Sequence, residues 1–373
     1  MKILHISDIH FCTIVDSKTK TSKPAHIFAN EATGENYPEA LAGVILGDER
    51  LAAAPPKIVI CSGDIGWSGD ATDYRYAKVF FETLRDKWRA TTFCIVPGNH
   101  DVTLELSKEK KDRTVEDSER QDCFFNFLIE FYGEAQMREL FPLVATAEIA
   151  QRKLADRNKL IYFNSKIDEC LLLGLNSAAS INGLGDPVTV GKEVKALLQL
   201  PKIRTLCNDD SRVKICTLHH HLFPFVESPF WASYHNPHAP MPPFDRSIIS
   251  NSADLQVWLK ERSFDLVCHG HKHDFHGRED LLWRVGDRQS PRRLAVIGAG
   301  SAGVEPGPLP GAKANSYTVI DVLPVGRDRT YFRVTVARQD RTQEEVAVVH
   351  EARRLVAAGA VERTLPNRFE ADK

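Results

Sequence analysis

The sequence predicts an α/β fold in which buried strands alternate with helices. Short apolar runs of four to six residues recur along the chain, and each ends abruptly in polar residues. Continuous apolar runs, without the alternation of a half-exposed strand, are typical of strands buried on both faces. Helical stretches separate the runs, and this alternation of strand and helix predicts a layered α/β architecture.

Six of the runs share this design and are predicted to be strands over residues 2–7, 57–62, 92–97, 171–175, 213–218 and 264–268. Helices are predicted between them over residues 37–53, 72–87, 122–132, 191–200 and 254–262. The second helix carries Tyr76, Val79, Phe80 and Leu84 at the spacing of one helix face. In sheets of this kind functional residues gather at the carboxyl ends of the strands, and this is where the polar clusters fall.

Three polar or proline-rich segments interrupt the alternation. Residues 13–36 are rich in Ser, Thr and Lys, which predicts a long surface loop, and residues 104–121 form a mixed charge run typical of a solvated helix face. Residues 224–245 combine several prolines with Phe230, Trp231 and Tyr234. Such a long segment is expected to be either a lid over a substrate or a proline-stiffened crossing or dimer contact.

A single catalytic domain is predicted over residues 1–322, with the three segments as insertions. Strands over residues 294–299 and 316–322 are expected to complete its sheets. Residues 323–373 are predicted to form a C-terminal extension of a strand over 330–337, a helix over 344–357 and a tail. The helix is predicted from the helical spacing of Val346, Val349, Ala352 and Val356.

Composition excludes several classes of protein. The chain has 373 residues, of which 43% are hydrophobic, so it can form a sizeable core, and disorder, collagen and a disulfide-rich miniprotein are excluded. The 48 basic residues nearly balance 50 acidic ones, for a net charge of −2. A protein held on nucleic acid mainly by counterion release is therefore not favoured.

Cysteine usage and the N-terminus predict a cytoplasmic protein. The chain begins MKILHISDIHF, which leaves no room for the apolar region of a signal peptide. No apolar run approaches the roughly 18 residues of a spanning helix, so no membrane span is expected. The eight cysteines form no CxxC pair, which indicates reduced thiols and not a disulfide frame.

The chemistry of the chain is predicted from the polar residues that follow successive strands, namely Asp8, His10, Asp64, Asn99, His100, His219, His271 and His273. Carboxylate and carboxamide oxygens mixed with imidazole nitrogens suit Mn, Fe, Zn or similar ions better than Ca. Two such ions a few ångströms apart can polarise a phosphoryl oxygen and convert a shared water to hydroxide for in-line attack on phosphorus. The set therefore predicts phosphoester hydrolysis.

The same residues carry a resemblance to a known family. The series Asp8-Ile9-His10, Gly63-Asp64, Gly98-Asn99-His100-Asp101, His219 and Gly270-His271-Lys272-His273 resembles the five-part signature of the calcineurin-like metallophosphoesterases, over residues 1 to about 275. The resemblance implies a four-layer α/β-β-α sandwich with a dinuclear metal site at the strand ends. The stretch 66–74 and Asn176-Ser177 are similar to the cyclic-nucleotide phosphodiesterase-like branch.

The resemblance also implies a role for each site residue. Asp8, His10 and His273 would hold the first metal, Asp64 would bridge, and Asn99, His219 and His271 would hold the second. His100 would protonate the leaving oxygen or stabilise the phosphate, with Asp101 fixing its orientation. Since residues 219–221 are all histidine, His220 is the alternative to His219 as ligand. Trp231, Tyr234 and His220 are the candidates for substrate binding.

The expected function is a metal-dependent phosphodiesterase that acts on a small phosphoester or a nucleotide, with two divalent ions of which Mn²⁺ is favoured over Fe and Zn. A DNA exonuclease or endonuclease with the same ligands is the alternative, although such an enzyme should carry a basic, aromatic-lined path for a strand. A metal-binding scaffold without turnover is the third hypothesis, and the complete ligand set with His100 argues against it. The oligomeric state is open.

Overall fold

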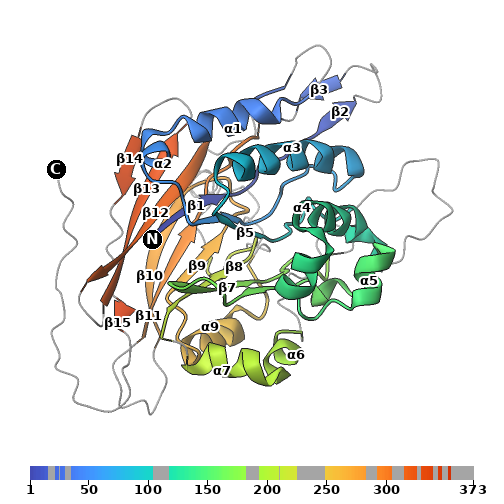
Figure 1. The fold of residues 1–373 in the computed structure, drawn as a ribbon. Helices are drawn as coiled ribbons and strands as arrows, with labels where there is room; N and C mark the ends of the chain where they lie inside the picture. The colour runs from blue at the N-terminus through green and yellow to red at the C-terminus, as the bar shows by residue number, and fades with distance from the viewer. Residues whose placement is uncertain are drawn as a thin grey trace, which may run out of the picture.

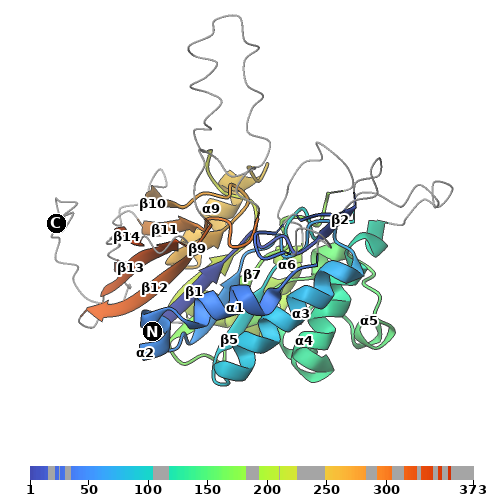
Figure 2. The same cartoon turned by 90° about the horizontal axis from the view of Figure 1, so that it is seen from above.

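Two β-sheets face each other at the centre of the molecule, and helices lie on the outer side of each sheet (Figures 1 and 2). The structure is a computed structural model that describes residues 1–15, 22–24, 26–29, 35–103, 117–181, 193–209, 211–224, 248–282, 292–304, 315–325, 329–338, 343–346 and 352–353. The layered α/β prediction is confirmed.

The first sheet has the strand order β14-β13-β12-β1-β4-β5, with β15 paired to β13. Its strands are β1 (Lys2–Ile6), β4 (Ile58–Cys61), β5 (Thr92–Ile95), β12 (Ser316–Val325), β13 (Arg329–Arg338), β14 (Gln343–Val346) and β15 (Ala352–Arg353). β1, β4 and β5 are parallel, whereas β12 is antiparallel to β1. The parallel strands bring the carboxyl ends of β1, β4 and β5 to one edge.

The second sheet has the order β10-β11-β9-β8-β7-β6. Its strands are β6 (Tyr162–Asn164), β7 (Cys170–Gly174), β8 (Val213–Thr217), β9 (Leu266–His269), β10 (His276–Leu282) and β11 (Arg292–Gly298). The four central strands β7, β8, β9 and β11 are parallel, and the outer strands β6 and β10 are antiparallel to their neighbours.

Strands of the second sheet are buried on both faces, as their continuous apolar runs predicted. In β7, Leu172 packs in the core shared with the first sheet, whereas Leu171 and Leu173 pack on the opposite face. That opposite core contains Leu197 of α6 and Leu255 of α9. Because each face has an apolar partner layer, the fold is a four-layer sandwich of helices, sheet, sheet and helices.

The helices divide between the two outer layers. Beside the first sheet lie α1 (Pro38–Leu46), α2 (Glu49–Ala53), α3 (Ala71–Lys87) and α4 (Asp122–Leu140), and beside the second lie α6 (Glu193–Gln199), α7 (Pro201–Asp209) and α9 (Ser252–Glu261) (Figures 1 and 2). Short helices are η2 (Asp117–Gln121), α5 (Thr146–Gln151) and η3 (Arg157–Lys159). The side chain of Asp70 caps α3 by accepting from the backbone N–H groups of Thr72 and Asp73.

Several elements differ from the sequence predictions. The helix predicted over 37–53 is two helices, and the one predicted over 122–132 continues to Leu140 past Gly133, whose φ of 76° interrupts the helical geometry. Residues 13–36 include a hairpin of β2 (Thr13–Val15) and β3 (Ser22–Pro24). Residues 104–116 and 225–247, which hold most of the other two insertions, lie outside the described residues.

The helix predicted over residues 344–357 is wrong where the structure describes this segment. Residues 343–346 form β14 and residues 352–353 form β15, and both strands pair antiparallel with β13. β13 offers an edge of unpaired backbone groups, and pairing with it outweighs a helical spacing that rests on only four apolar residues. β12 runs across position 322 to Val325, and the domain boundary proposed there stays a prediction.

The eight cysteines all lie within the described residues, and none of them forms a disulfide. Cys61, Cys94, Cys216 and Cys268 are fully buried in strands or beside them, and burial raises the pKa of each thiol. These four therefore pack as small hydrophobic side chains, as predicted. Among the described residues, no helix is long and apolar enough to cross a membrane.

Buried His26 should make the protein sensitive to acid. Its ring stacks on Phe11 with centroids 4.8 Å apart, its Nδ1 accepts from the backbone N–H of Phe28, and burial lowers the pKa of His26 from 6.5 to about 3. Below pH 6.5 the His26 imidazole is protonated in the unfolded chain, whereas in the folded chain it stays neutral until the pH approaches 3. The stability contributed by neutral His26 is therefore complete above pH 6.5 and is lost as the pH falls toward 3.

The change His26→Phe should reduce this acid sensitivity. Between pH 7.5 and 5.0, the fall in the free energy of unfolding should be smaller in the variant by about 2 kcal/mol, which is 1.5 pH units below 6.5 at about 1.4 kcal/mol each. Urea unfolding in EDTA at the two pH values measures this difference, and any effect of lost packing cancels because it is present at both. An equal fall in both proteins would contradict the prediction.

Candidate metal centre

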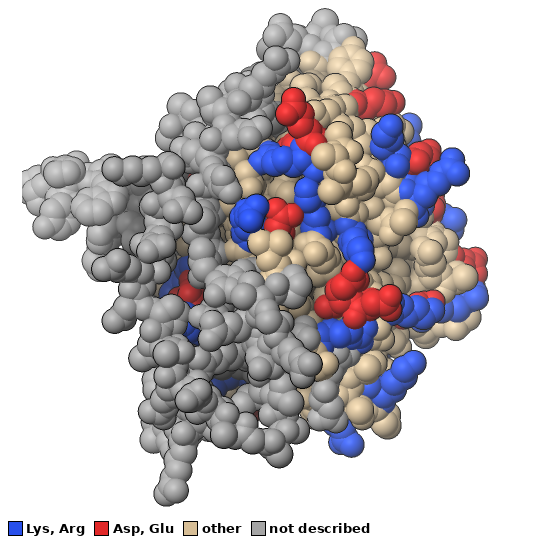
Figure 3. Space-filling view, turned by 60° about the vertical axis from the view of Figure 1, so that its left-hand side comes forward, with Lys and Arg blue, Asp and Glu red and all other residues tan. Residues whose placement is uncertain are grey.

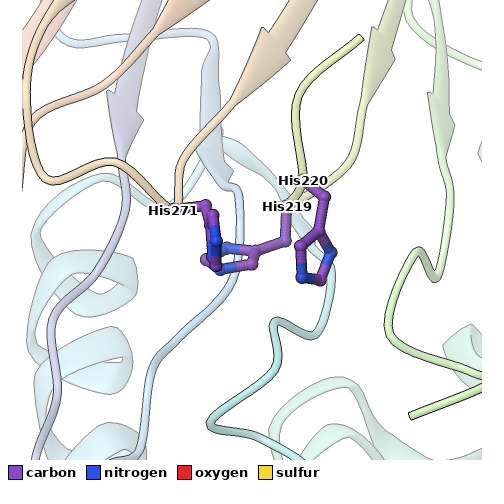
Figure 4. Close-up of side chains that lie close together, drawn as sticks. All are labelled: His219, His220 and His271. Atoms are coloured by element: carbon purple, nitrogen blue, oxygen red, sulfur yellow. The ribbon is translucent and has the colours of Figure 1, made fainter. Parts of the chain in front are cut away.

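The carboxyl ends of β1, β4, β5, β8 and β9 meet between the two sheets, and the polar residues after each strand converge there. Asp8 and His10 follow β1, Asp64 follows β4, and Asn99 follows β5. His219 follows β8, and the pair His271 and His273 follows β9. Figure 4 shows His219 and His271 in the loops after these strands. The predicted placement at strand ends is confirmed.

Backbone pairing beyond the strands explains why these residues arrive together. The loops after β1 and β4 continue the parallel hydrogen bonding of the two strands: Asp8 N–H donates to Gly63 O at 3.0 Å, and His10 N–H donates to Asp64 O at 3.1 Å. The loop after β9 joins them, because the N–H of His271 donates to the Asp8 carboxylate at 3.0 Å. The sheets therefore fix the spacing of the three loops.

One cluster of possible ligand atoms comes from Asp8, His10, Asp64 and His273, whose donor atoms all lie within 4.8 Å of one another. His10 Nε2 is 3.2 Å from His273 Nε2, and His273 Nε2 is 3.3 Å from Asp8 Oδ1. The side chains of Asp8 and His10 are fully buried. These are the residues that the family resemblance assigned to the first metal together with the bridge.

A second cluster of possible ligand atoms comes from His219, His220 and His271. The Asn99 side chain joins it, because its Oδ1 is 3.0 Å from His219 Nε2 and 2.8 Å from His271 Nδ1. Figure 4 shows His219 and His271 close together, with His220 beside them. The second predicted set of ligands is thus also brought together.

Asp64 lies between the two clusters. Its Oδ2 is 3.2 Å from His219 Nε2 in the second cluster and 3.8 Å from His10 Nε2 in the first. Its Oδ1 accepts from the backbone N–H of His100 at 2.8 Å, which fixes the carboxylate plane. A side chain at Gly98 would collide with this carboxylate, so the close approach requires glycine. This geometry suits a carboxylate shared by two cations.

The structure distinguishes His219 from His220. The Nδ1 of His219 lies 2.8 Å from Ser62 O, and because a carbonyl only accepts, Nδ1 carries a proton and Nε2 is the nitrogen that faces Asn99 and His271. His220 instead has its Nδ1 2.8 Å from Ser177 Oγ. His219 Nε2 thus faces Asn99 and His271, whereas His220, in the same cluster of possible ligand atoms, contacts Ser177. His219 as the ligand stays a prediction.

The charges of the clusters suit cations. Burial opposes ionisation of Asp64, but the charge of His219 and its hydrogen bond to the carboxylate hold the pKa of Asp64 well below its usual range. Burial also favours neutral His219, yet the Asp64 carboxylate raises the pKa of His219 to about 9. Burial lowers the pKa of His10 to about 3. In the metal-free protein, protons on His219 thus balance carboxylate charge that a metal ion would balance.

The backbone at the clusters is strained. The described residues include seven non-glycine residues with positive φ, and five of them are predicted ligands, namely Asp8, His10, Asp64, His271 and His273, with φ from 52° to 78°. Such conformations cost on the order of 1–3 kcal/mol each and persist where the surrounding structure imposes them. Their concentration at one place indicates a functional site.

His100 lies beside the clusters and is held by a contact that the sequence did not predict. Its Nδ1 is 2.8 Å from Trp67 O, and its ring packs against the Trp67 indole with centroids 4.8 Å apart. The ring of His10 is also 4.8 Å away. Since the carbonyl can only accept, Nδ1 donates to it, which leaves Nε2 as the nitrogen available to a substrate.

Asp101 was predicted to fix the orientation of His100, but the hydrogen bond of His100 Nδ1 is with Trp67 O, so any such effect of Asp101 is indirect. The buried Asp101 carboxylate accepts from the backbone N–H groups of Gly98 at 2.9 Å and Gly66 at 3.1 Å, and from the Tyr74 hydroxyl at 3.0 Å. Asp101 therefore joins the loops after β4 and β5. Asp101 supports the backbone that carries His100, whereas the His100 side chain is held by Trp67 O.

Trp67 and Ser177 contact histidines of the site, and Asp73 holds the backbone of Trp67; none of the three was predicted to have a role. Trp67 and Asp73 lie in the stretch 66–74, and Ser177 follows β7. The stretch 66–74 and Asn176-Ser177 were noted in the sequence for their similarity to one branch of the family. The sequence could not show, however, that a main-chain carbonyl would hold His100. Trp231 and Tyr234, the other candidates for substrate binding, lie outside the described residues.

The donor set fits two metal ions. Ligand atoms at about 2.0–2.2 Å from a common ion lie about 3–4 Å from each other. The separations found here, from 2.8 to 3.9 Å, are of this size. Oxygen and imidazole donors without thiolate suit Mn, Fe or Zn. A two-sheet α/β sandwich with two adjoining donor clusters at its strand ends defines the dinuclear metallohydrolase class.

The chain belongs to the calcineurin-like phosphoesterase family, whose model matches residues 1–275. This family hydrolyses phosphoesters with a dinuclear metal centre, so the resemblance noted in the sequence is confirmed. The comparison with curated proteins found no match.

One solved structure shares the fold, and a second is similar to this chain. The purple acid phosphatase from yellow lupin (Lupinus luteus) seeds is 12% identical, with a TM-score of 0.50 over 92% of this chain and 52% of the lupin chain. This chain therefore spans about half the length of the lupin enzyme. A dimetal phosphatase from Danio rerio is 14% identical, with a TM-score of 0.47 over 94% of this chain and 99% of that chain.

Proposed function

We propose that the protein hydrolyses a small phosphodiester, such as a nucleotide diester, with the help of two divalent cations. The observation that carries this proposal is the position of Asp64, whose Oδ2 faces an imidazole of each donor cluster while its Oδ1 is held by the loop that carries His100. Two cation positions and a possible proton donor thus adjoin one another, which is the arrangement that phosphoester hydrolysis needs.

The residues are proposed to divide the binding of the cations. Asp8, His10 and His273 would hold the first ion, Asn99, His219 and His271 the second, and Asp64 both. When bound, the two ions supply a water of lowered pKa and neutralise charge that develops on the phosphoryl oxygens. The strained and hydrogen-bonded loops hold the ligands in place before any ion binds, so little reorganisation is needed.

His100 is proposed to give a proton to the leaving oxygen. The Trp67 carbonyl fixes the Nδ1 proton and the ring orientation, so Nε2 can be the atom that transfers a proton to substrate. His220, held by Ser177 next to the second cluster, is proposed to line the phosphate site. Both roles place imidazole groups where a diester would meet the two ions.

Manganese and a cytoplasmic location complete the proposal. The mixed oxygen and nitrogen donors support Mn²⁺, with Fe and Zn as the other ions of this preference. The absence of a disulfide among the eight described cysteines supports a reducing compartment. On the face shown in Figure 3, acidic and basic side chains of the described residues are interspersed, which favours a small substrate over a nucleic-acid strand.

An activity screen tests the proposal. Metal-free protein is reconstituted with Mn²⁺, Fe²⁺ or Zn²⁺ and assayed on cyclic nucleotides, nucleotide diesters, phospholipid head-group diesters, monoesters, and single-stranded and nicked DNA. The proposal expects the highest kcat/KM on a small diester. A higher rate on DNA would replace it by a nuclease function, and metal binding without hydrolysis of any of these esters would overturn it.

A further inference from the structure

We infer that Asp73 is a positioning residue that holds His100 through the Trp67 peptide. The inference rests on the proposed role of His100 as proton donor. Asp73 lies in the first turn of α3, nine positions after Asp64 in the chain, and it touches neither donor cluster in the contacts described above. Its effect on the reaction would therefore pass through the loop that connects β4 to α3.

One carboxylate oxygen of Asp73 makes the hydrogen bonds that hold this loop. Its side chain is buried, and its Oδ2 accepts from Trp67 N–H at 3.1 Å, from Ser68 N–H at 2.8 Å and from the Ser68 hydroxyl at 2.9 Å. A Cβ at Gly66 would lie 2.8 Å from the same oxygen, so glycine at this position allows the approach. Three donors on one carboxylate oxygen fix the path of the chain at residues 67 and 68.

Trp67 connects Asp73 to His100 through hydrogen bonds on both sides of its backbone. The N–H of Trp67 is held by Asp73 on one side, and the carbonyl of the same residue accepts from His100 Nδ1 at 2.8 Å on the other. The indole packs against the rings of His100 and His10, at centroid distances of 4.8 and 5.2 Å. One residue thus connects the start of α3 to the ring that faces the substrate.

The next residue of α3 supports the loop from its other side. Tyr74 donates to Asp101, which also accepts from the backbone N–H groups of Gly66 and Gly98. Asp73 and Tyr74 therefore hold both loops, after β4 and after β5, against the start of one helix. The arrangement explains how a half-buried ring can keep one orientation although its only described side-chain hydrogen bond is to a main-chain carbonyl.

The burial of Asp73 is unfavourable in itself. Removal from water, with the charge of Asp70 as a further cause, raises the pKa of Asp73 from 3.8 to about 6. A carboxylate kept ionised against its desolvation at a place next to a candidate active site is more typical of a functional group than of one retained for stability.

Removal of the Asp73 carboxylate should lower the turnover of some substrates more than that of others. A proton donor matters most when the leaving oxygen is a strongly basic alkoxide, and it matters little when the leaving group is a p-nitrophenolate. If Asp73 acts through His100, its removal lowers turnover of the first kind of diester only. A role in stability or in metal binding would lower both rates together.

The experiment compares Asp73→Ala with Asp73→Asn, His100→Ala and the double variant in Mn²⁺-loaded protein. Substrates are an alkyl diester with a primary alkoxide leaving group and bis(p-nitrophenyl) phosphate. For Asp73→Ala we expect kcat to fall about 10- to 100-fold on the alkyl diester and less than about 3-fold on the aryl diester. Metal content should remain unchanged. The Asn variant should recover most of the alkyl rate, because its amide oxygen can accept the same bonds.

Asp70→Ala is the matched control. Asp70 lies three residues away and caps the same helix by accepting from Thr72 N–H at 2.8 Å and Asp73 N–H at 3.4 Å. It also accepts from the Ser68 hydroxyl at 3.0 Å, but the backbone N–H groups of Trp67 and Ser68 are bonded to Asp73. Loss of Asp70 should destabilise α3, yet the ratio of alkyl to aryl rates should stay at the wild-type value. In the His100→Ala background, Asp73→Ala should cause no further loss on the alkyl diester.

The inference and the proposed function fail in different ways. Equal losses on both diesters, a loss of metal, or a full additional loss in the His100→Ala background would overturn the role of Asp73 while leaving His100 as proton donor. If His100→Ala itself affected both diesters equally, the proposed role of His100 would fail, and the inference would fail with it.

Discussion

His100→Ala should keep both metal ions and lose about 10²- to 10⁴-fold of kcat on an alkyl phosphodiester, the usual contribution of a general acid. The His100 side chain belongs to neither cluster of possible ligand atoms, and its contact is with Trp67 O. The backbone N–H that holds Asp64 Oδ1 is retained in alanine. The substitution therefore removes the proton donor without removing a metal ligand.

Metal analysis of the purified variant and steady-state kinetics on two diesters measure this result. On bis(p-nitrophenyl) phosphate, whose leaving group needs little protonation, the same variant should lose far less activity and serves as its own control. If it hydrolysed the alkyl diester as fast as wild type, His100 would not be the proton donor. A loss of one metal ion would instead indicate that the ring acts as a ligand.

The strands and the residues after them were predictable from the sequence because two physical signals coincide there. Runs such as residues 58–61 are buried on both faces, so they are apolar throughout, and the chain must turn polar where it leaves the sheet. Parallel strands then bring those turns to one edge. Asp64 and Asn99 could therefore be placed together although 35 positions separate them in the chain.

Elements that depend on a neighbour already in place could not be predicted. β14 has the sequence QEEV, which fits a helix face as well as a strand, and it is a strand because β13 offers an open edge. β10 (HGREDLL) carries mostly polar residues and pairs on one side only, with β11. For such edge strands the hydrogen bonds of the partner, and not the apolar pattern, determine the structure.

At the site, side-chain chemistry was predictable and main-chain chemistry was not. An Asp next to a His suggests a carboxylate that orients an imidazole, yet Asp101 accepts from backbone groups and a carbonyl takes its place at His100. Every residue has such a carbonyl, so no sequence pattern marks the one at Trp67. The different contacts of His219 and His220 similarly depend on which ring reaches Ser62 O.

Asp64→Ala should remove a ligand from both metal sites, whereas Asp8→Ala should remove a ligand from the first site only, because the contact of Asp8 with the second set is a hydrogen bond from the backbone N–H of His271. Asp64 Oδ2 faces His219 Nε2 at 3.2 Å and His10 Nε2 at 3.8 Å, which belong to different clusters. Asp8 Oδ1 faces His273 Nε2 at 3.3 Å and His10 Nε2 at 3.9 Å, both in the first cluster. Even outer-shell partners contribute about 10- to 100-fold to metal affinity, so loss of the bridging ligand should exceed 100-fold at each site.

Titration of metal-free protein with Mn²⁺ in a calorimeter measures the stoichiometry: two ions for wild type, one for Asp8→Ala and none of comparable affinity for Asp64→Ala. Thermal unfolding in EDTA shows whether each variant is folded, which separates loss of a ligand from loss of the fold. One retained high-affinity ion in Asp64→Ala would contradict the bridge. Since both variants remove a buried carboxylate within the same cluster, only a ligand shared by two ions accounts for a different number of ions lost.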